Sequence, residues 1–514
     1  MGEPIRNIVI VGGGTAGWMA AAALSRFLES SRTSITLVES EAIGTIGVGE
    51  ATIPQIAQFN AMLGLDEADV LRATSGTYKL GIEFRDWARL GDAYFHPFGE
   101  YGFDLEGLDF HHYWLRLRKL GGTDGLDAYS LNALAAYAGK FFKPDGNPNS
   151  PLSKLGFAYH FDATLYGRFL RGYSEERGVS RVEGLVVSVE QDAESGHVRS
   201  VTLEDGRTLK GDLFIDCTGF GGLLIEKTLQ TGYENWSELL PMNRAVALPT
   251  RAVKPPRPYT VATARTAGWT WRIPLQHRTG NGHVYCADHM EGAEAEDILV
   301  QSVDGEPIAE PRHLRFTTGV RRKLWNKNVV AIGLSAGFLE PLESTSIHMI
   351  QSGVAKLIAL FPDTDFDPVL ADEYNRILSV SFSHIRDFIV LHYIATERED
   401  SEFWRRMKAA TPTGTLAAKM ELLEHSGRFF RYDDELFSVV SWLAVMEGQR
   451  RGPRGYNPVA DKLSERNLAQ SLANMRGVFA KTSDAMPSHV DYIARFCRSD
   501  VVVPGREIPL SEAV

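Results

Sequence analysis

The sequence predicts an α/β protein in which a module built on a parallel sheet is followed by a mainly helical module. Two patterns lead to this prediction. The chain opens with an apolar run, a glycine-rich turn and an Ala-rich stretch, which is the order of strand, turn and helix. After about residue 350 the pattern is mostly helical, rich in Leu, Ala, Arg and Glu. A chain of 514 residues is also expected to form at least two packed modules.

The first elements fit one β-α-β unit. Residues 8–11 are expected to form a strand, residues 12–17 a tight turn, and the stretch that ends at Phe27 a helix. A second apolar run, residues 35–38, ends at Glu39 and is expected to be the next strand. This order predicts a Rossmann-like module.

Later segments indicate that the first module is discontinuous. A helix is expected from Asp162 to Gly178, followed by hairpin strands around residues 184–189 and 198–203. Short buried strands are expected at residues 213–216 and 329–333, far from the opening strands. We therefore expect a cofactor module over residues 1–365, with substrate-side insertions around 70–155 and 235–325. A helical substrate module is expected over 366–514, with a loosely held tail from Val501.

Composition excludes several classes of function. The formal net charge is −11, from 54 Lys plus Arg against 65 Asp plus Glu, and no basic run resembles a nucleic-acid footprint. The cysteines Cys217, Cys286 and Cys497 have no spacing typical of zinc or a disulfide framework. No apolar stretch approaches a membrane-spanning length. We expect a cytoplasmic protein with no metal, nucleic-acid or membrane partner.

The turn predicts a dinucleotide site. Gly12, Gly14 and Gly17 form G-x-G-x-x-G, with Thr15 and Ala16 inside it. In this pattern the glycines permit the turn, admit a pyrophosphate to the backbone and allow close helix packing. The carboxylate of Glu39, at the end of the second strand, is placed to accept hydrogen bonds from a ribose. A glycine-rich turn without ligand is the alternative.

Further segments favour FAD. Residues 213–220, LFIDCTGF, resemble a strand motif of FAD-dependent monooxygenase-like proteins, which implies an FAD module of the flavin monooxygenase type. The sequence holds one complete dinucleotide fingerprint, so a separate NAD(P)H domain is not expected. Residues 47–54, GVGEATIP, resemble a strap over the flavin. These likenesses add the cofactor contacts Gly49, Glu50, Ala51 and Asp216, and Gly333 and Leu334 are also expected at the cofactor.

Residues 269–274, WTWRIP, read W-x-W-x-I-P and resemble the signature of the flavin-dependent halogenases, the group best known through the tryptophan halogenases. The resemblance implies that Trp269 and Trp271 lie near the flavin and keep organic substrate away from it. Two tryptophans at this spacing also fit one face of a strand packed in a core.

Lys79 has the setting of the lysine that captures hypohalous acid in this family. A lone lysine is usually a solvated charge, but this one stands between Tyr78 and an apolar run and is expected to be partly buried. A desolvated ammonium either donates strong hydrogen bonds or loses its proton and becomes a nucleophile.

Residues 337–348, GFLEPLESTSIH, resemble the halide and active-site strip of the family. The resemblance implies that Glu343 is the catalytic carboxylate, with Ser344 beside it, and that the backbone amides of Thr345 and Ser346 hold the halide. Tryptophan halogenases carry glycine where this chain has Ser346, so halide preference is expected to differ, towards bromide. The Ser and Thr residues would also cap a helix start, and both interpretations can hold because helix N-termini bind anions.

Two segments are assigned to the substrate. Residues 96–99, HPFG, resemble the segment whose phenylalanine stacks on the indole, so His96, Pro97 and Phe98 are expected at the substrate. The alternative is a turn with a core aromatic. Trp442 and Leu443 align with a tyrosine pair that recognises the amino acid in halogenases for free tryptophan. An apolar pair does not compensate a buried charged group, so indole or a substituted indole is expected to react better than free tryptophan.

The resemblance implies an enzyme that forms hypohalous acid from chloride or bromide, O2 and reduced FAD (FADH2), and halogenates an electron-rich aromatic. A separate NAD(P)H-dependent flavin reductase is the expected partner, and a homodimer the candidate assembly. Two alternatives stay open: an FAD-dependent aromatic monooxygenase that hydroxylates its substrate, and a non-catalytic FAD-binding redox sensor. The monooxygenase would not require Lys79, Glu343 and the paired tryptophans together, and the sensor would form no halide-dependent product.

Overall fold

A computed structural model describes residues 2–42 and 49–500. The chain forms two compact units, each assembled from three separate segments. The first unit contains Met1–Thr74, Phe161–Asn243 and Arg315–Ser383, and the second contains Ser75–His160, Arg244–Leu314 and His384–Val514. The functional boundary expected at residues 365 and 366 stays a prediction.

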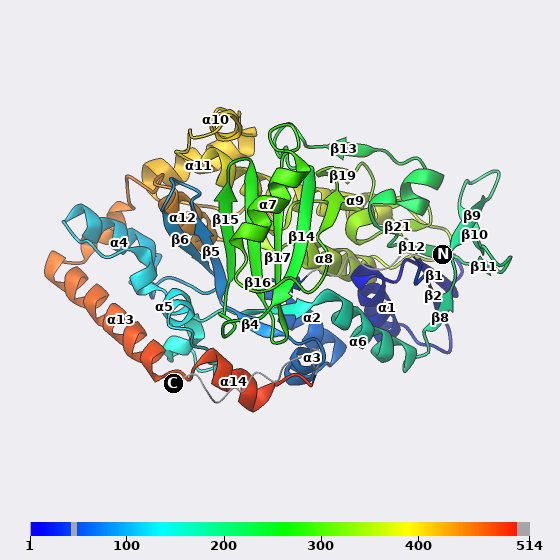
Figure 1. The fold of residues 1–514 in the computed structure, drawn as a ribbon, viewed down its shortest axis with the longest axis horizontal. Coiled ribbons are helices and arrows are strands. Elements are labelled where there is room, and N and C mark those ends of the chain that lie inside the picture. The colour runs from blue at the N-terminus through cyan, green and yellow to red at the C-terminus, as the bar shows by residue number, and fades with distance from the viewer. Residues whose placement is uncertain (1, 43–48, 501–514) are drawn as a thin grey trace. The chain divides into compact units, whose positions relative to one another are not determined.

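The first unit is organised around a six-stranded sheet with the order β20-β21-β12-β1-β2-β8 (Figure 1). β1 lies at its centre and pairs in parallel with β2 on one side and β12 on the other. β12 in turn pairs in parallel with β21, which confirms that the sheet combines segments far apart in the chain. The strands are β1 (Asn7–Val11), β2 (Ser34–Glu39), β8 (Ser180–Glu183), β12 (Leu213–Asp216), β20 (Trp325–Asn326) and β21 (Val329–Ala331).

Three helices of the first unit pack together. α1 (Thr15–Phe27) contacts both α6 (Ala163–Glu175) and α8 (Ser346–Ala359). The four consecutive alanines of α1 are fully buried, because small side chains let neighbouring helices approach closely. α6 begins after Asp162, whose carboxylate accepts the backbone N–H groups of Thr164 and Leu165, so the helix predicted from this residue is confirmed.

The predicted hairpin is also confirmed, since β9 and β10 pair antiparallel with Val201 opposite Val189. A third strand, β11, extends it. The other described elements of this unit are β3 (Gly49–Ala51), α2 (Gln55–Leu63), α3 (Glu67–Ala73), β9 (Val186–Gln191), β10 (Val198–Leu203), β11 (Thr208–Lys210), η3 (Gly219–Gly221), η4 (Leu223–Thr228), β13 (Tyr233–Asn235), β19 (Gly319–Arg321), η5 (Gly333–Ser335), β22 (Gly337–Phe338) and η6 (Pro341–Glu343).

The second unit contains a seven-stranded sheet with the order β18-β14-β17-β16-β15-β5-β6. β14, β17, β16 and β15 pair antiparallel with their neighbours, whereas β15 and β5 pair in parallel. Helix α7 (Gly292–Ser302) lies on β14 and β17 (Figure 1). The strands are β5 (Gly81–Arg85), β6 (Ala93–Pro97), β14 (Arg244–Arg251), β15 (Thr260–Arg265), β16 (Gly268–Pro274), β17 (Arg278–Tyr285) and β18 (Arg312–Arg315). In a further, three-stranded sheet with the order β3-β7-β4, β4 (Thr77–Lys79) and β7 (Ala158–Asp162) pair antiparallel.

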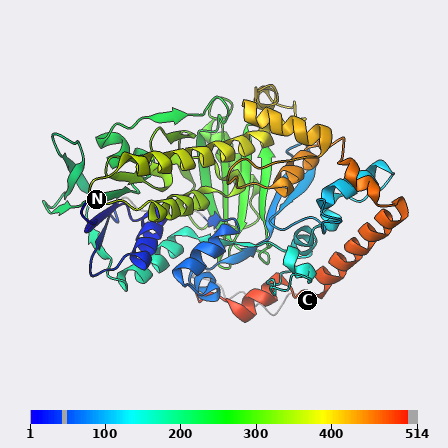
Figure 2. The same ribbon diagram turned by 180° about the vertical axis from the view of Figure 1, so that it is seen from behind.

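Helices dominate the rest of the second unit, as the sequence predicts for the chain after residue 350. α9 (Pro368–Ile394) begins in the first unit and ends in the second. The long helix α13 (Glu465–Ala485) runs along α4 and α5 (Figure 2). The remaining helices are α4 (Phe110–Lys119), η1 (Leu126–Tyr129), α5 (Leu131–Tyr137), η2 (Pro151–Lys154), α10 (Glu402–Lys408), α11 (Gly414–Ser426), α12 (Val439–Gly448), η7 (Pro458–Lys462) and α14 (His489–Phe496).

Among the residues described, no helix is long and apolar enough to cross a membrane. The tail expected from Val501 lies outside the described residues, as do Gly47 and Val48 of the predicted strap.

Candidate active site

The predicted nucleotide turn connects β1 to α1 in the first unit. Gly12 has a φ of 111°, and a Cβ there would lie 2.3 Å from the carbonyl oxygen of Cys217. A Cβ on Gly17 would lie 1.9 Å from the carbonyl oxygen of Gly12. Both positions therefore require glycine, the first for conformation and space and the second for space alone. The turn needs these residues whatever it binds.

Gly14 differs from its neighbours. A Cβ on this residue would meet no protein atom within 4 Å, so its side of the turn is open. Gly14 is also the N-cap of α1 and provides no side-chain hydrogen bond, and the first turn of α1 has no acidic residue. Open space beside free N–H groups at a helix start suits a pyrophosphate, so these residues fit FAD.

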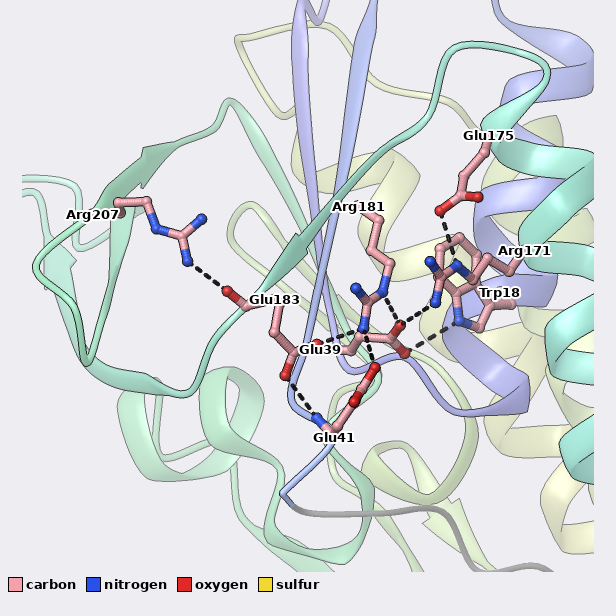
Figure 3. A network of polar contacts seen from close by, with 8 residues as sticks. All are labelled: Trp18, Glu39, Glu41, Arg171, Glu175, Arg181, Glu183 and Arg207. Carbon is pink, nitrogen blue, oxygen red and sulfur yellow. Dashed lines mark hydrogen bonds and ion pairs between the residues drawn. The ribbon is translucent and has the colours of Figure 1, made fainter.

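Glu39 lies at the end of β2 within a network of charges (Figure 3). Its carboxylate accepts the indole N–H of Trp18 at 3.3 Å and is ion-paired with Arg181 of β8. A Cβ on Gly13 would overlap Glu39 Oε2, so the side chain lies directly against the glycine turn. The hydrogen bond with Glu39 raises the pKa of the Arg181 guanidinium. Arg181 therefore positions the predicted ribose acceptor, a role that sequence reasoning missed.

Two further predicted cofactor residues have structural roles. Asp216 is fully buried, and its carboxylate accepts N–H groups of Thr218, Leu224 and Ile225 as well as the Thr218 hydroxyl. It therefore fixes the turn after β12, and direct contact with FAD stays a prediction. Gly333 has a φ of 78°, and a Cβ there would lie 2.7 Å from Ala16 Cβ, which brings η5 against the glycine turn.

The other predicted cofactor residues lie in two short elements, η5 and β3. Leu334 lies in η5, and Gly49, Glu50 and Ala51 form β3. Their contact with the cofactor stays a prediction.

The predicted halide strip joins η6 to α8. Glu343 is fully buried at the end of η6, and Ser344 has a φ of 60°, an uncommon conformation for a residue other than glycine. This turn directs the chain into α8, which begins at Ser346. The amides of Thr345 and Ser346 therefore stand at the start of a 14-residue helix, where an anion is favoured.

The Ser and Thr residues favour a capped start for this helix, but its N-cap residue, Thr345, makes no side-chain cap bond. The backbone of Thr345 is in the αR region instead of the extended region usual for an N-cap, and its hydroxyl makes no cap bond. The buried Oγ1 atom has no hydrogen-bond partner within the protein. Burial lowers the pKa of His348, in the first turn of α8, to about 4, so this side chain is neutral at pH 7. The Thr345 side chain therefore occupies none of the backbone N–H groups at the start of α8, which stay available to an anion.

Lys79 lies in the second unit, at the end of β4, and is fully buried. Its Nζ lies 4.8 Å from the centroid of the Phe98 ring, a cation–π distance. The neighbouring Tyr78 stacks on Phe141 with ring centroids 4.0 Å apart. The expectation of a buried lysine is confirmed, and two of the predicted site residues, Lys79 and Phe98, lie together.

Two histidines that the sequence did not single out hold the lysine strand. The Thr77 hydroxyl donates to the carbonyl of Pro274 at 2.8 Å, so it accepts from His160 Nδ1 at 2.9 Å. The backbone N–H of Tyr78 donates to His489 Nε2 at 3.1 Å, and His489 Nδ1 donates to the carbonyl of Pro256 at 2.8 Å.

His160 and His489 are both neutral, because the pKa of each ring is lowered. Burial lowers the pKa of His489 to about 4. Burial and the nearby charge of Lys79 hold the pKa of His160 well below its usual value. Neutral rings avoid placing a second positive charge beside the lysine.

The predicted substrate segment follows β6. His96 and Pro97 end this strand, and the backbone N–H of Phe98 donates to the carbonyl of Leu80, next to Lys79. Buried Asn132 donates to the same Leu80 carbonyl at 2.7 Å and to the carbonyl of Gly156 at 2.6 Å. Asn132 is therefore a positioning residue for this segment, and its place far along the chain gave no sequence signal.

The tryptophan pair lies on β16, with ring centroids 6.0 Å apart. Trp269 and Trp271 are both buried, as the core interpretation also predicts. Gly282 stands opposite Trp271 on β17, and a Cβ there would lie 2.1 Å from the indole ring. Because Gly282 has no side chain, the Trp271 ring can lie directly over its backbone. Their function near the flavin stays a prediction.

Trp442 lies on α12, which packs on β6 where Gly448 meets the Tyr94 ring. Its ring centroid is 5.7 Å from that of Phe388, and the Phe388 centroid is 5.9 Å from that of His96. Trp442, His96 and Phe388 thus belong to one aromatic cluster in the second unit. Glu343 belongs to the first unit, so its action together with Lys79 stays a prediction. No group of three or more His, Cys, Asp or Glu in the described part of the chain is placed to hold a metal.

Comparisons with known proteins identify the family of this chain. The tryptophan halogenase family model matches residues 7–465. The chain is 37% identical to a 7-chloro-L-tryptophan 6-halogenase from Kutzneria sp. (strain 744), over 96% of this chain and 100% of that protein.

Solved structures give the same result. A flavin-dependent halogenase from Xanthomonas campestris superimposes with a TM-score of 0.94 and 45% identity, covering 98% of this chain and 100% of the other. One from Brevundimonas sp. BAL3 has a TM-score of 0.92 and 46% identity, covering 95% and 99%. Because the family model and these relatives match nearly the whole length of the chain, this chain belongs to the tryptophan halogenase family.

Proposed function

We propose that this enzyme halogenates indole or a substituted indole, and that Lys79 delivers the halogen. The observation that carries the proposal is the setting of Lys79, a fully buried ammonium with the Phe98 ring at 4.8 Å. A desolvated ammonium is a strong hydrogen-bond donor, and an aromatic ring at this distance is a face on which a planar substrate stacks.

The first unit supplies the oxidised halogen. Flavin-dependent halogenases use reduced FAD, O2 and a halide, from which hypohalous acid forms. In this chain Gly12, Gly14 and Gly17 would receive the pyrophosphate and Glu39 the ribose. The amides of Thr345 and Ser346 would hold the halide at the start of α8.

The second unit directs the halogen to the substrate. Lys79 either holds hypohalous acid by a hydrogen bond or reacts with it to form a haloamine, which releases water. When the ring of the substrate takes the halogen, the leaving group is hydroxide, which departs as water, in the first case and the lysine amine in the second. The proton that leaves the ring passes to a carboxylate, for which Glu343 is our candidate. Trp269 and Trp271 would separate the organic substrate from the flavin, and this separation favours halogenation over hydroxylation.

The substrate assignment rests on Trp442 and Leu443. Both are buried, with exposed fractions of 4% and 1%, and neither presents a hydroxyl or a charge. A charged amino acid placed against them would lose its hydration without compensation. Uncharged indoles therefore suit this surface better than free tryptophan.

Two finer parts of the proposal concern the halide and the electron donor. Ser346 occupies the halide position at which glycine is usual in the family, so we propose a preference for bromide over chloride. A separate NAD(P)H-dependent flavin reductase would supply reduced FAD. Competition between equal concentrations of the two halides measures the first, and dependence of turnover on added reductase measures the second.

The deciding experiment combines the purified enzyme, a flavin reductase, NADH, FAD, bromide or chloride, and a panel of indoles. Mass spectrometry identifies products by halogen isotope pattern. We expect halogenated indole, with free tryptophan reacting more slowly. Hydroxylated products would support a monooxygenase, and the absence of any halide-dependent product would support a redox sensor. Faster reaction of free tryptophan would overturn the substrate assignment alone.

A further inference from the structure

A buried ion pair in the second unit has no role in the halogenation chemistry described above. Lys419 of α11 donates to both carboxylate oxygens of Glu435, which precedes α12. Their exposed fractions are 4% and 6%. His384 Nε2 lies 3.5 Å from Glu435 Oε1. Both charges are therefore removed from bulk water and neutralise one another.

The ammonium of Lys419 is also surrounded by aromatic rings. Its Nζ lies 4.4 Å from the ring centroid of Tyr432, 5.0 Å from that of Phe429 and 5.6 Å from that of Trp442. The faces of aromatic rings attract a cation, and the attraction strengthens away from water. The ion pair is thus adjacent to the ring of Trp442, the residue assigned to the substrate.

A small cavity connects the ion pair to this aromatic cluster. Lys419, Glu435 and Trp442 line it together with Phe388 and Phe437. The rings of Phe388 and Phe437 stack with centroids 3.8 Å apart, and His96 lies 5.9 Å and 6.4 Å from them. The cavity has room for about one water molecule. A charged substituent is too large to enter it, and on a substrate held against Trp442 such a group would face the ion pair across the space of about one water molecule.

The third charged group of the cavity already has partners. Asp387 is ion-paired with Arg386 at 2.8 Å and accepts the Thr413 hydroxyl at 2.8 Å. The charge that a substrate would meet is consequently that of Lys419 and Glu435. A buried ion pair contributes little net stability, whereas removal of one partner leaves the other charge uncompensated. Substitution of one partner should therefore leave the other able to bind a substrate group with the same charge as the side chain that was removed.

We propose that the Lys419–Glu435 pair is a charge filter of the substrate pocket. The pair disfavours binding of indoles that carry a charged substituent at C3. Such a substituent could form an ion pair with Lys419 or Glu435 only if these two residues separated from each other. Uncharged indoles leave the pair intact. The inference rests on the proposed function and adds the residues that determine which class of indole the enzyme accepts.

The test compares indole, indole-3-propionate, which is an anion, and tryptamine, which is a cation. The wild-type enzyme is assayed first, at about pH 8 to limit competition from histidine cations. We expect kcat/KM for indole to exceed that for either charged indole by at least about 10-fold. Failure of indole to react would contradict the proposed function itself. Equal rates for all three substrates would overturn the filter alone.

Single substitutions should then change the selectivity between the charged indoles, one in favour of the anion and the other in favour of the cation. Glu435→Gln leaves Lys419 unpaired, so kcat/KM for indole-3-propionate relative to indole should rise at least about 10-fold, mainly through KM, with no gain for tryptamine. Lys419→Met removes the lysine partner of Glu435 and leaves His384 Nε2 3.5 Å from its carboxylate, so the same gain is expected for tryptamine alone. Changes of equal size for both charged substrates would overturn the proposal.

Matched controls separate the filter from a general change of charge. Glu421→Gln on the exposed face of α11 and Lys481→Met on the exposed face of α13 alter the net charge equally and should leave all three ratios unchanged. If Glu435→Gln does not fold, Glu435→Asp shortens the acceptor by one methylene and should shift selectivity in the same direction to a smaller extent. No shift in a folded Glu435→Asp enzyme would overturn the proposal.

Discussion

The two units of this protein position their functional groups in different ways. In the first unit the glycine turn is one stretch of backbone, and the spaces around Gly12, Gly14 and Gly17 determine what it can hold. In the second unit Lys79 depends on side chains from distant segments: His489 lies 411 positions after Tyr78, and His160 lies 83 positions after Thr77. The difference teaches that the proposed cofactor site depends on backbone space, whereas the setting of Lys79, the proposed residue of halogen transfer, depends on packed side chains.

The sharpest test of this comparison is Lys79→Ala. We expect halogenation of indole to fall by about 1,000-fold, because the side chain that we propose to hold the electrophile is lost. FAD binding should not change, because the glycine turn belongs to the other unit. Product formation is measured by mass spectrometry and FAD affinity by flavin fluorescence. The exposed lysine variant Lys481→Ala is the control, and a loss of FAD affinity in Lys79→Ala would break the comparison.

A second prediction concerns pH. The pKa of His489 is lowered to about 4 in the folded protein, against 6.5 for the free side chain. As pH falls below 6.5 the unfolded chain gains a proton that the folded chain does not, so stability decreases until about pH 4. The contribution is about 3 kcal/mol.

Urea unfolding between pH 7 and pH 4 tests this prediction. His489→Gln has no titrating ring, and its free energy of unfolding should depend less steeply on pH over that range. Subtraction of the two curves removes the contribution of other groups, such as Asp127, whose pKa burial raises to about 6. Parallel curves would contradict the assignment of His489 as a buried neutral ring.

The backbone space of the first unit is tested by Gly14→Ala. The added methyl group meets no protein atom within 4 Å, so the melting temperature of the FAD-free protein should not change. It would stand where the pyrophosphate approaches, and FAD affinity should fall by about 10-fold. Gly172→Ala in α6 also adds a methyl group in open space and is the matched control. Unaltered FAD affinity in Gly14→Ala would place the phosphates elsewhere.

The smallest expected effect is that of Arg181→Gln. The ion pair orients Glu39 at the glycine turn, and its loss should weaken FAD binding by about 3-fold with no effect on substrate KM. The matched variant is Arg207→Gln, since Arg207 lies in the same network but donates to the backbone carbonyl of Glu183. A similar loss in both variants would assign the effect to the whole edge of the sheet instead of to Glu39.

Much of the fold followed from local pattern. The strands at residues 8–11 and 35–38, the helix that ends at Phe27 and the hairpin near residue 200 are confirmed, because each is defined by neighbours in sequence. The capped helix start that the Ser and Thr residues favour has no side-chain cap at its N-cap residue, because the unusual backbone of Ser344 brings the chain into α8 in a conformation that the residue types do not reveal. Family resemblance supplied Lys79, Glu343 and the tryptophan pair, which periodicity alone does not distinguish from surface charge or core.

The sequence by itself determined the glycine turn, the order of elements around it and the segments typical of a halogenase, since each depends on residues adjacent in the chain. Only the tertiary structure decided which groups support them. Arg181 beside Glu39, His489 behind Tyr78 and Glu435 on Lys419 are pairs that no local pattern predicts. The physical reason is that charge neutralisation and hydrogen bonding act through space, and a buried side chain finds its partner wherever folding places one.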